Sequence, residues 1–278
     1  MKLFKQLVGA FVVGGALAFI GQLIYALWCA VIVSGESGFL STLAAPLTLA
    51  SMGVVGGVLY LPGIYDKLEE WGGFGAMLPF SGFCVAVSHT VEGAKVDSGS
   101  FGKAVKAGAV LVAQIIGVGS LGAVILAAIA VFANTYLFVG VTPPQDAVSA
   151  TAVFSPGVPL SVGQLFGSFL IGGTICTLFQ AFAAFTGLSA PKVLILGMLV
   201  GGLLTPAGMM SSMEQLGCIG AQFTAVGAGS AVMGTAMLLF SGIFAPFVTV
   251  LCVFVALTIL GCVWGLIRAT HFKSPKNV

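Results

Sequence analysis

Two stretches of this chain, 107–139 and 233–267, contain no Asp, Glu, Lys or Arg. About 20 consecutive apolar residues are enough to cross the hydrocarbon core of a bilayer as an α-helix. Backbone in lipid must also satisfy its own hydrogen bonds, which a helix does within one segment. These stretches therefore predict membrane-spanning helices, and we expect an all-α integral membrane protein.

The composition of the whole chain agrees with this interpretation. Of its 278 residues, 59% are hydrophobic and 6% are charged, whereas soluble domains carry about 25% charged residues. This excludes a soluble enzyme, a disordered chain and a nucleic-acid-binding protein, which would need a basic face. All six cysteines lie in apolar stretches, so we expect isolated buried thiols and no disulfide framework.

Six segments are predicted to span the membrane. They are 7–33, 40–61, 107–139, 162–185, 193–204 and 233–267. Two further Gly-rich apolar segments, 71–88 and 215–232, are either short spans or re-entrant segments that enter and leave on one side. Pro246 leaves open how the last apolar stretch is divided.

The distribution of basic residues discriminates between these topologies. With six spans and two re-entrant segments, all ten Lys and Arg residues fall on one side of the membrane. With eight full spans they would be divided between the two sides. The positive-inside rule favours the first topology, with both termini cytoplasmic.

The sequence also contains an internal repeat. Gly14-Gly15 and Gln22 recur as Gly172-Gly173 and Gln180, at an offset of 158. The offset then becomes 145 and relates Pro46 to Pro191, Gly56 to Gly201, Gly63 to Gly208, Glu69 to Glu214, Gly72 to Gly217, Gly75 to Gly220 and Gly82 to Gly227. We therefore predict a first membrane repeat at 1–139, an external linker at 140–161, a second repeat at 162–267 and a basic cytoplasmic tail at 268–278.

The number of spans determines how the two repeats are related. Three spans per repeat is an odd number, so the second copy is predicted to be inverted relative to the first. Transporters and channels with such inverted repeats place their pathway near the bilayer midplane, where the repeats meet. Irregular backbone at membrane depth occurs only where protein buries it or water lines it. The two Gly-rich segments are therefore the candidate permeation site.

The polar residues of these segments have two interpretations each. Glu70 and Glu214 are either part of a solvated loop or a gate. Gln22 and Gln180 lie inside spans together with Gln114, where interhelical hydrogen bonding is expected and pore lining is the alternative. The hydroxyls of Ser81 and Thr224 could bind a carboxylate.

The glycines of the two segments are open to the same question. Their exposed backbone amides could bind an anion without any formal charge. Small residues equally permit helices to pack closely. The glycines concerned are Gly72, Gly75, Gly217 and Gly220.

No pattern in the chain points to catalysis, a metal or a cofactor. His89 and His271 are the only histidines, and neither has a neighbouring cluster with metal-ligand spacing. We therefore expect neither an enzyme nor a metal site. The basic residues at the end of the chain, which begin with Arg268, are predicted to anchor it to anionic lipid.

Two motifs resemble a known family. Residues 70–76 (EWGGFGA) and 79–83 (PFSGF), with Tyr60 and Pro62 upstream, are similar to the conserved stretch of the stage V sporulation protein AC/AE (SpoVA) membrane proteins. In the second half, residues 172–176, Gln180 and Pro191 are similar to the opening of that family's first helix and the turn after it. Because family members are about half this length, the chain resembles two fused or duplicated units.

The resemblance implies a specific role. Family members move dipicolinic acid, often with calcium, across the spore inner membrane of endospore-forming bacteria, in sporulation and again in germination. Some are described as tension-gated channels, and they act beside other sporulation membrane subunits and a soluble dipicolinate-binding subunit. Carried over to this chain, the pathway residues are Glu70, Gly72, Gly75, Pro79, Ser81 and Gly82. The second copy departs from the motif, with Thr224 and Val226 at the positions of Pro79 and Ser81, so it is expected to be partly structural.

Three functions remain open at this point. The first is a channel or facilitator for dipicolinate. The second is a secondary transporter of another small solute on the same plan, and the third is a scaffold of a sporulation complex that conducts nothing. Membrane lipid is the expected surrounding, and the sequence leaves a homo-oligomer open.

Overall fold

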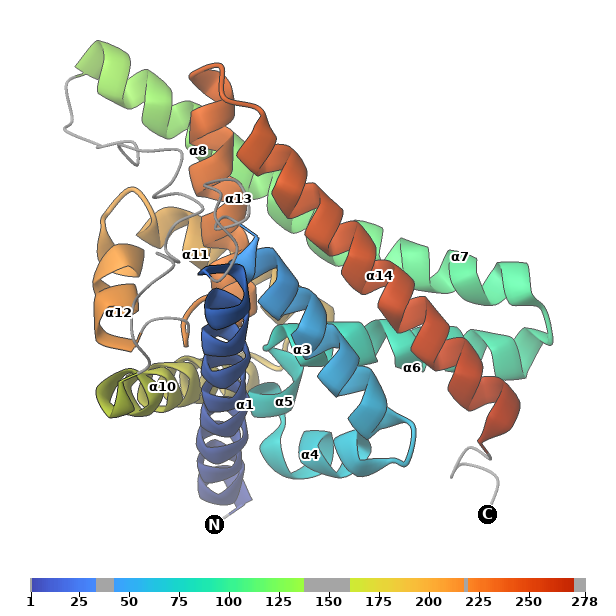
Figure 1. Cartoon of the computed structure of the whole chain (residues 1–278). Helices are drawn as coiled ribbons and strands as arrows, with labels where there is room; N and C mark the ends of the chain where they lie inside the picture. The colour runs from blue at the N-terminus through green and yellow to red at the C-terminus, as the bar shows by residue number, and fades with distance from the viewer. Residues whose placement is uncertain (1, 34–42, 138–160, 218–219, 273–278) are drawn as a thin grey trace.

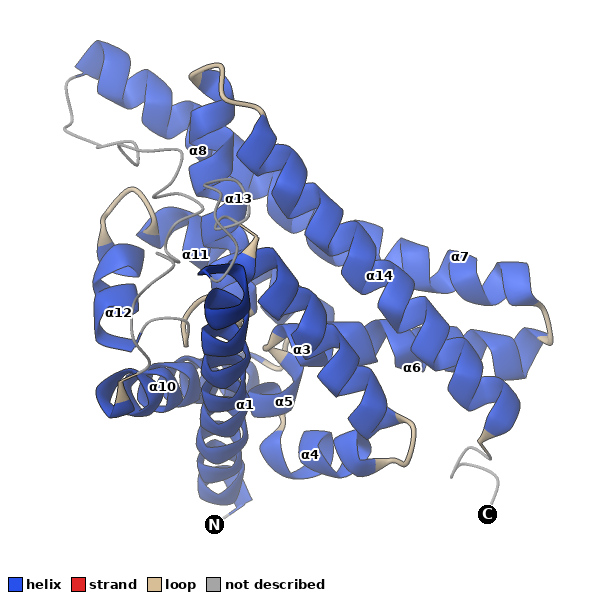
Figure 2. Cartoon of the chain, viewed as in Figure 1, coloured by secondary structure: helices blue, strands red, loops and turns tan. Residues whose placement is uncertain are grey.

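The computed structural model describes residues 2–33, 43–137, 161–217 and 220–272. Every element in these ranges is helical, apart from one isolated β-bridge between Pro79 and Thr224. Figure 2 shows the helices joined by short loops. The predicted all-α fold class is confirmed, and the predicted linker at 140–161 lies almost wholly outside the described residues.

The helices divide between the two halves of the chain. The first half contains α1 (Lys2–Val33), α3 (Ala44–Tyr60), α4 (Ile64–Gly72), α5 (Phe74–Met77), α6 (Phe80–Ser98), α7 (Phe101–Val112), the π-helical turn η1 (Ala113–Gly117) and α8 (Val118–Leu137). The second half contains α10 (Val162–Thr186), α11 (Ala190–Leu204), α12 (Met209–Gly217), α13 (Ala225–Phe240) and α14 (Ala245–His271). Figure 1 shows the start of α1 and the end of α14 in the lower part of the molecule.

Four described helices are long and apolar enough to cross a bilayer. They are Leu3–Ile32, Phe101–Asn134, Val162–Thr186 and Ala245–His271. A fifth span results if α3 and α4, which are bent by 103° at their junction, count as one. The chain is thus a multi-pass membrane protein. The predicted spans at 40–61 and 193–204 correspond to shorter helices, α3 with 17 residues and α11 with 15.

The first Gly-rich segment is a helix break rather than a simple turn. The chain is helical to Met77, extended at Pro79 (φ −64°, ψ 157°) and helical again from Phe80. Helix α6 does not end near residue 88, where the apolar run ends, but continues to Ser98. The polar stretch 89–106 therefore consists of the end of α6 and the start of α7.

The last apolar stretch, whose division the sequence left open at Pro246, consists of two helices. Residues 233–240 belong to α13, which begins at Ala225, and α14 begins only at Ala245. Gly242 has a left-handed φ of +88°, a conformation that glycine adopts without steric cost. Pro246 lies in the first turn of α14, where its missing N–H costs nothing.

The repeat in the sequence recurs in the helix boundaries. Helices α4 and α12 begin at Ile64 and Met209 and end at Gly72 and Gly217, at the offset of 145 in both cases. The residues that precede them, Gly63 and Gly208, both have a left-handed φ, of +78° and +71°. Matched residues thus adopt matched local structure in the two halves.

Helices α1 and α10 form the main contact between the halves (Figure 1). Gly15 of α1 packs against Phe169 of α10, and Gly173 of α10 packs against Phe11 of α1. The rings of Phe11 and Phe169 meet edge to face, with centroids 5.6 Å apart. These residues are related by the offset of 158, so each contact has its reciprocal and the two helices pack through equivalent faces.

Candidate functional site

The chain has one helix break at Pro79, before α6, and an equivalent one at Thr224, before α13. These two breaks meet in the interior of the protein. The N–H of Phe80 donates to the carbonyl of Phe223 (2.9 Å), and the N–H of Ala225 donates to the carbonyl of Leu78 (3.0 Å). We call residues 78–80 and 223–225 the central bridge. Its residues are related by the offset of 145, so exchanging the two halves converts one hydrogen bond into the other.

The local sequence explains why the chain forms this bridge. Pro79 has no N–H, and it is extended, as is Thr224 (φ −109°, ψ 170°). Each of these two residues caps the helix that follows it, α6 or α13. The first N–H groups of a helix lack partners within the helix and need others when they are buried. Here the first N–H of each helix finds its acceptor in the other half of the chain.

The bridge also has a defined electrostatic character. The N-termini of α6 (Phe80–Ser98) and α13 (Ala225–Phe240) both lie at it. A helix N-terminus carries a partial charge of about +0.5. Two such ends meet at one place, so the bridge favours an anion over a cation.

In this structure the bridge is closed. Leu78, Phe223 and Thr224 are each about 1% exposed, and Phe80 is 5% exposed. The hydroxyl of Thr224 donates to the carbonyl of Ala221 (2.9 Å). Passage of a solute between the two breaks would require them to separate.

Three of the four predicted glycines support close packing rather than anion binding. A Cβ on Gly75 would lie 2.7 Å from the Cα of Ala10, and one on Gly220 would lie 2.8 Å from the Cα of Ser168. These two contacts are equivalent in the two repeats. Gly72 packs against the side chain of Val13 in the same way. Because helix backbones approach closely here, the glycines belong to the interface between helices.

This packing predicts opposite effects for two Gly→Ala substitutions. Gly75→Ala overfills the contact with α1 and is expected to destabilise the protein by about 1–3 kcal/mol. Gly93 lies exposed on α6 with open space around it, so Gly93→Ala is expected to stabilise by about 0.5–1 kcal/mol through helix propensity. Thermal unfolding of the two variants in detergent measures the difference, and equal melting temperatures would contradict the packing role of Gly75.

The other motif residues of the first half are also structural in their contacts. Ser81 is fully buried, and its hydroxyl lies 2.9 Å from the Tyr65 hydroxyl. Because the Tyr65 hydroxyl donates its one hydrogen to the carbonyl of Ala76 (2.8 Å), Ser81 is the donor to Tyr65. Gly82 has no side chain, which lets the backbone of α6 lie close to the carbonyl of Ala76 on α5. This network holds α4, α5 and the start of α6 together.

Two of the three glutamines inside the spans make the contacts expected of them. The Oε1 atom of Gln180 on α10 accepts a hydrogen bond from the N–H of Phe74 on α5 (2.8 Å). Gln22 on α1 accepts one from the hydroxyl of Ser168 on α10 (3.3 Å). Gln114 differs, because it is exposed on η1. Gln22 and Gln180 therefore tie the two halves of the chain together.

The predicted acidic residues are not part of the bridge segments. Glu70 is exposed on α4. Glu214 and Gly217 lie in α12, at positions where only the backbone is described. The geometry thus brings Pro79 and Thr224 together but does not place Glu70 beside them.

A cluster of charged residues that sequence reasoning missed lies around Arg268. Its guanidinium donates two hydrogen bonds to Asp66 (3.1 and 2.5 Å) and lies over the ring of Tyr60, 4.1 Å from the centroid. The Nε atom of Arg268 is 3.7 Å from Glu92. Arg268 is 3% exposed, so its predicted role as a lipid anchor is wrong. No spacing rule could pair it with Asp66, which lies 202 residues earlier.

His89 belongs to the same cluster. Its Nε2 atom is 3.1 Å from Glu69 and 3.4 Å from Asp66, and its ring meets that of Tyr60 edge to face. The Tyr60 hydroxyl donates to the carboxylate of Glu92. We call Tyr60, Asp66, Glu69, His89, Glu92 and Arg268 the ionic cluster. One signal for it was present in the sequence, since Asp66 and Glu69 are three residues apart and share a face of α4.

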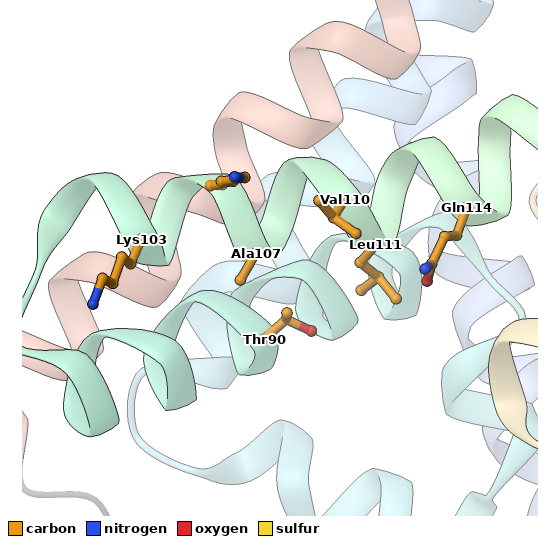
Figure 3. Close-up of a pocket in the computed structure, with 7 residues that line it drawn as sticks. Thr90, Lys103, Ala107, Val110, Leu111 and Gln114 are labelled. Atoms are coloured by element: carbon orange, nitrogen blue, oxygen red, sulfur yellow. The ribbon is translucent and has the colours of Figure 1, made fainter.

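A shallow groove of about 470 Å³ lies between α6 and α7 (Figure 3). Lys103 lies at one end and Gln114 at the other, with Ala107, Val110 and Leu111 between them. The helix that carries these residues is one of the four long apolar helices. None of the residues that line the groove belongs to the central bridge.

Comparison with known proteins finds a similarity for the first half of the chain. Residues 6–131 match the family model described as SpoVAC/SpoVAEB sporulation membrane protein. The matched region runs from α1 into α8 and includes the motif residues 70–83, whereas α10 to α14 lie outside it. No curated protein and no solved structure matches the chain significantly.

Proposed function

We propose that this chain, whose residues 6–131 match the model of the SpoVAC/SpoVAEB sporulation membrane protein family, is a gated conduit for a small organic anion. Dipicolinate, alone or with calcium, is the favoured substrate, and the spore inner membrane is the proposed location. The observation that carries the proposal is the central bridge, where two helix breaks at equivalent positions of the two halves meet. Conduction needs no catalytic step by the protein.

The proposed architecture is an inverted repeat of two three-span units. The reciprocal contacts support it, because Phe80–Phe223 and Ala225–Leu78 exchange under one offset and α1 and α10 pack through equivalent faces. The six proposed spans are α1, α3, α7–α8, α10, α11 and α14. The broken segments α4–α6 and α12–α13 then meet at the repeat interface, as in transporters and channels of this plan. Both termini are proposed to be cytoplasmic.

The charge at the bridge supports an anion as the substrate. Helix N-termini bind carboxylates and phosphates through free N–H groups and the helix dipole. Arg268, the buried arginine of the ionic cluster, is already neutralised by Asp66. The proposed route therefore relies on backbone dipoles at α6 and α13 and on the Thr224 hydroxyl, which suit a carboxylate that must bind weakly enough to leave.

The bridge is also suited to act as a gate. Only two backbone hydrogen bonds join its two segments directly, each with a net contribution of about 0.5–1.5 kcal/mol. Membrane tension that pulls the halves apart would separate 78–80 from 223–225 and expose both helix N-termini. The closed packing seen here is the resting state in this proposal.

The proposed partners follow the family assignment. They are other sporulation membrane subunits, a soluble dipicolinate-binding subunit and the surrounding membrane lipid. A secondary transporter of another solute and a non-conducting scaffold are the alternative functions, and the flux experiment below distinguishes the proposed conduit from both. A homo-oligomer is compatible with all three functions.

Flux measurements on the full-length protein in liposomes test this function. Vesicles loaded with dipicolinate are expected to release it faster with the protein than without it, and faster still after an osmotic downshift. Release is followed by the luminescence of the terbium–dipicolinate complex outside the vesicles. Retention of dipicolinate under every osmotic condition would contradict the proposal, and release of a neutral solute such as sucrose at the same rate would contradict the selectivity for anions.

A further inference from the structure

We propose that Asp66, Glu69 and His89 form a binding site for a divalent transition-metal ion. One oxygen from each carboxylate and one imidazole nitrogen lie within 4.8 Å of one another. The Nε2 atom of His89 lies 3.1 Å from Glu69 Oε2 and 3.4 Å from Asp66 Oδ1. Ligands bound to a metal at about 2.0–2.2 Å are separated from each other by about 3.0–3.5 Å. The measured separations between these atoms therefore match those of three groups that bind one ion.

The surrounding helices hold the three ligands in place. Asp66 and Glu69 occupy one face of the short helix α4, and His89 is carried by α6, nine residues after its first residue, Phe80. Arg268 binds both oxygens of Asp66. A carboxylate accepts about four hydrogen bonds, so Asp66 Oδ1 still has a lone pair available on the side of His89. Hydrogen bonds of this kind orient metal ligands in known sites.

The charge of the ionic cluster favours a cation. Asp66, Glu69 and Glu92 bring three negative charges and Arg268 brings one positive charge, which leaves two negative charges when His89 is neutral. Glu92 is 7% exposed, and its Oε1 atom has no hydrogen-bond partner in the described part of the chain. Excess negative charge in such a partly buried site is costly unless it is compensated.

The ligand types indicate which ions fit. Calcium and magnesium prefer sites made of oxygen ligands, whereas imidazole favours zinc, nickel and iron, with carboxylates also suiting manganese. The side chain of His89 is 40% exposed and that of Asp66 is 26% exposed. The site is therefore open to entry of an ion, and water can complete its coordination.

The second half of the chain has no equivalent site by sequence. At the offset of 145, Ser211 stands in the position of Asp66, and Gly234 in that of His89. The proposed site is thus a feature of one half only. It ties α4 to α6 at one end of the molecule, and it does not depend on the proposed conduction of anions.

Metal titration of the purified full-length protein tests the site. After chelator treatment, the wild-type protein is expected to bind one Zn²⁺ per chain, and Mn²⁺ at the same place. At a metal concentration about 100 times the dissociation constant, its melting temperature is expected to rise by about 5–10 °C. His89→Ala and Glu69→Gln are each expected to weaken binding at least about tenfold. Glu70→Gln, a change at the next residue on the exposed side of α4, is the matched control and leaves binding unchanged.

Several results would overturn the proposal. Wild-type protein that binds no Zn²⁺ or Mn²⁺ stoichiometrically, or His89→Ala that binds as tightly as wild type, excludes the site. Binding of Ca²⁺ that is unaffected by His89→Ala excludes the imidazole as a ligand. If either variant fails to fold in the absence of metal, X-ray absorption of Zn²⁺-loaded wild type decides, because a first coordination shell without imidazole contradicts the assignment.

Discussion

Replacing Arg268 by Met is expected to lower the free energy of unfolding by about 3–5 kcal/mol. Arg268 is 3% exposed, and it pairs with Asp66 and lies near Glu92. Its removal leaves two carboxylates without a counter-charge in a partly buried place. It also removes the contact between the guanidinium and the ring of Tyr60. Unfolding of the purified protein in mixed detergent measures the loss.

Two further variants isolate the cause of this loss. Lys106→Met removes an exposed basic residue of α7, and such surface changes stay within about 0.5 kcal/mol. Adding Asp66→Asn and Glu92→Gln to Arg268→Met removes the uncompensated charges and is expected to restore much of the stability. A loss below about 1 kcal/mol for Arg268→Met alone would show that the ionic cluster does not hold α14 to α4 and α6.

A disulfide across the central bridge is expected to lock the protein closed. The hydrogen bonds on either side of Pro79 and Thr224 make them a non-hydrogen-bonded antiparallel pair, for which the Cα atoms lie about 4.5 Å apart. This separation falls within the range of about 4.4–6.8 Å found in disulfides. Oxidation of Pro79→Cys/Thr224→Cys should therefore cross-link the two halves, and dipicolinate release should fall to the level of protein-free vesicles.

The native cysteines require a matched background for this experiment. The chain contains six cysteines, so the pair is introduced into a variant whose cysteines are replaced by Ser or Ala and whose flux is verified first. The single variants Pro79→Cys and Thr224→Cys, treated with the same oxidant, are the controls. The flux of each single variant is expected to be the same with and without oxidant, because neither can form the cross-link.

The sequence predicted the features that depend on local pattern. Long runs without charge indicated membrane helices. The constant offset that relates residues such as Gly63 and Gly208 indicated a repeat, and these two glycines have similar backbone conformations in the structure. Gln180 was expected to bond across helices because an unpaired amide is costly in lipid, and it does. Packing was one of the two interpretations of Gly75 and Gly220, and the structure supports it.

The remaining features depend on contacts between distant residues. The first Gly-rich segment was given as 71–88, whereas α6 continues to Ser98 and includes Glu92, which is buried and bound to Tyr60. Arg268 was assigned to the membrane surface because its partner, Asp66, lies in the other half of the chain. The contact of Pro79 with Thr224 required the folded arrangement of both repeats, although the offset already marked the two positions as equivalent.

The most direct test of the central bridge as a gate is the rate of dipicolinate release from vesicles that contain oxidised Pro79→Cys/Thr224→Cys. The rate is measured under osmotic downshift before and after a membrane-permeant reductant is added to the same vesicles. We predict no protein-dependent release before reduction and recovery of release after it. Equal release in both states, with the cross-link verified by mass spectrometry, would contradict a pathway that opens between the two halves at this bridge.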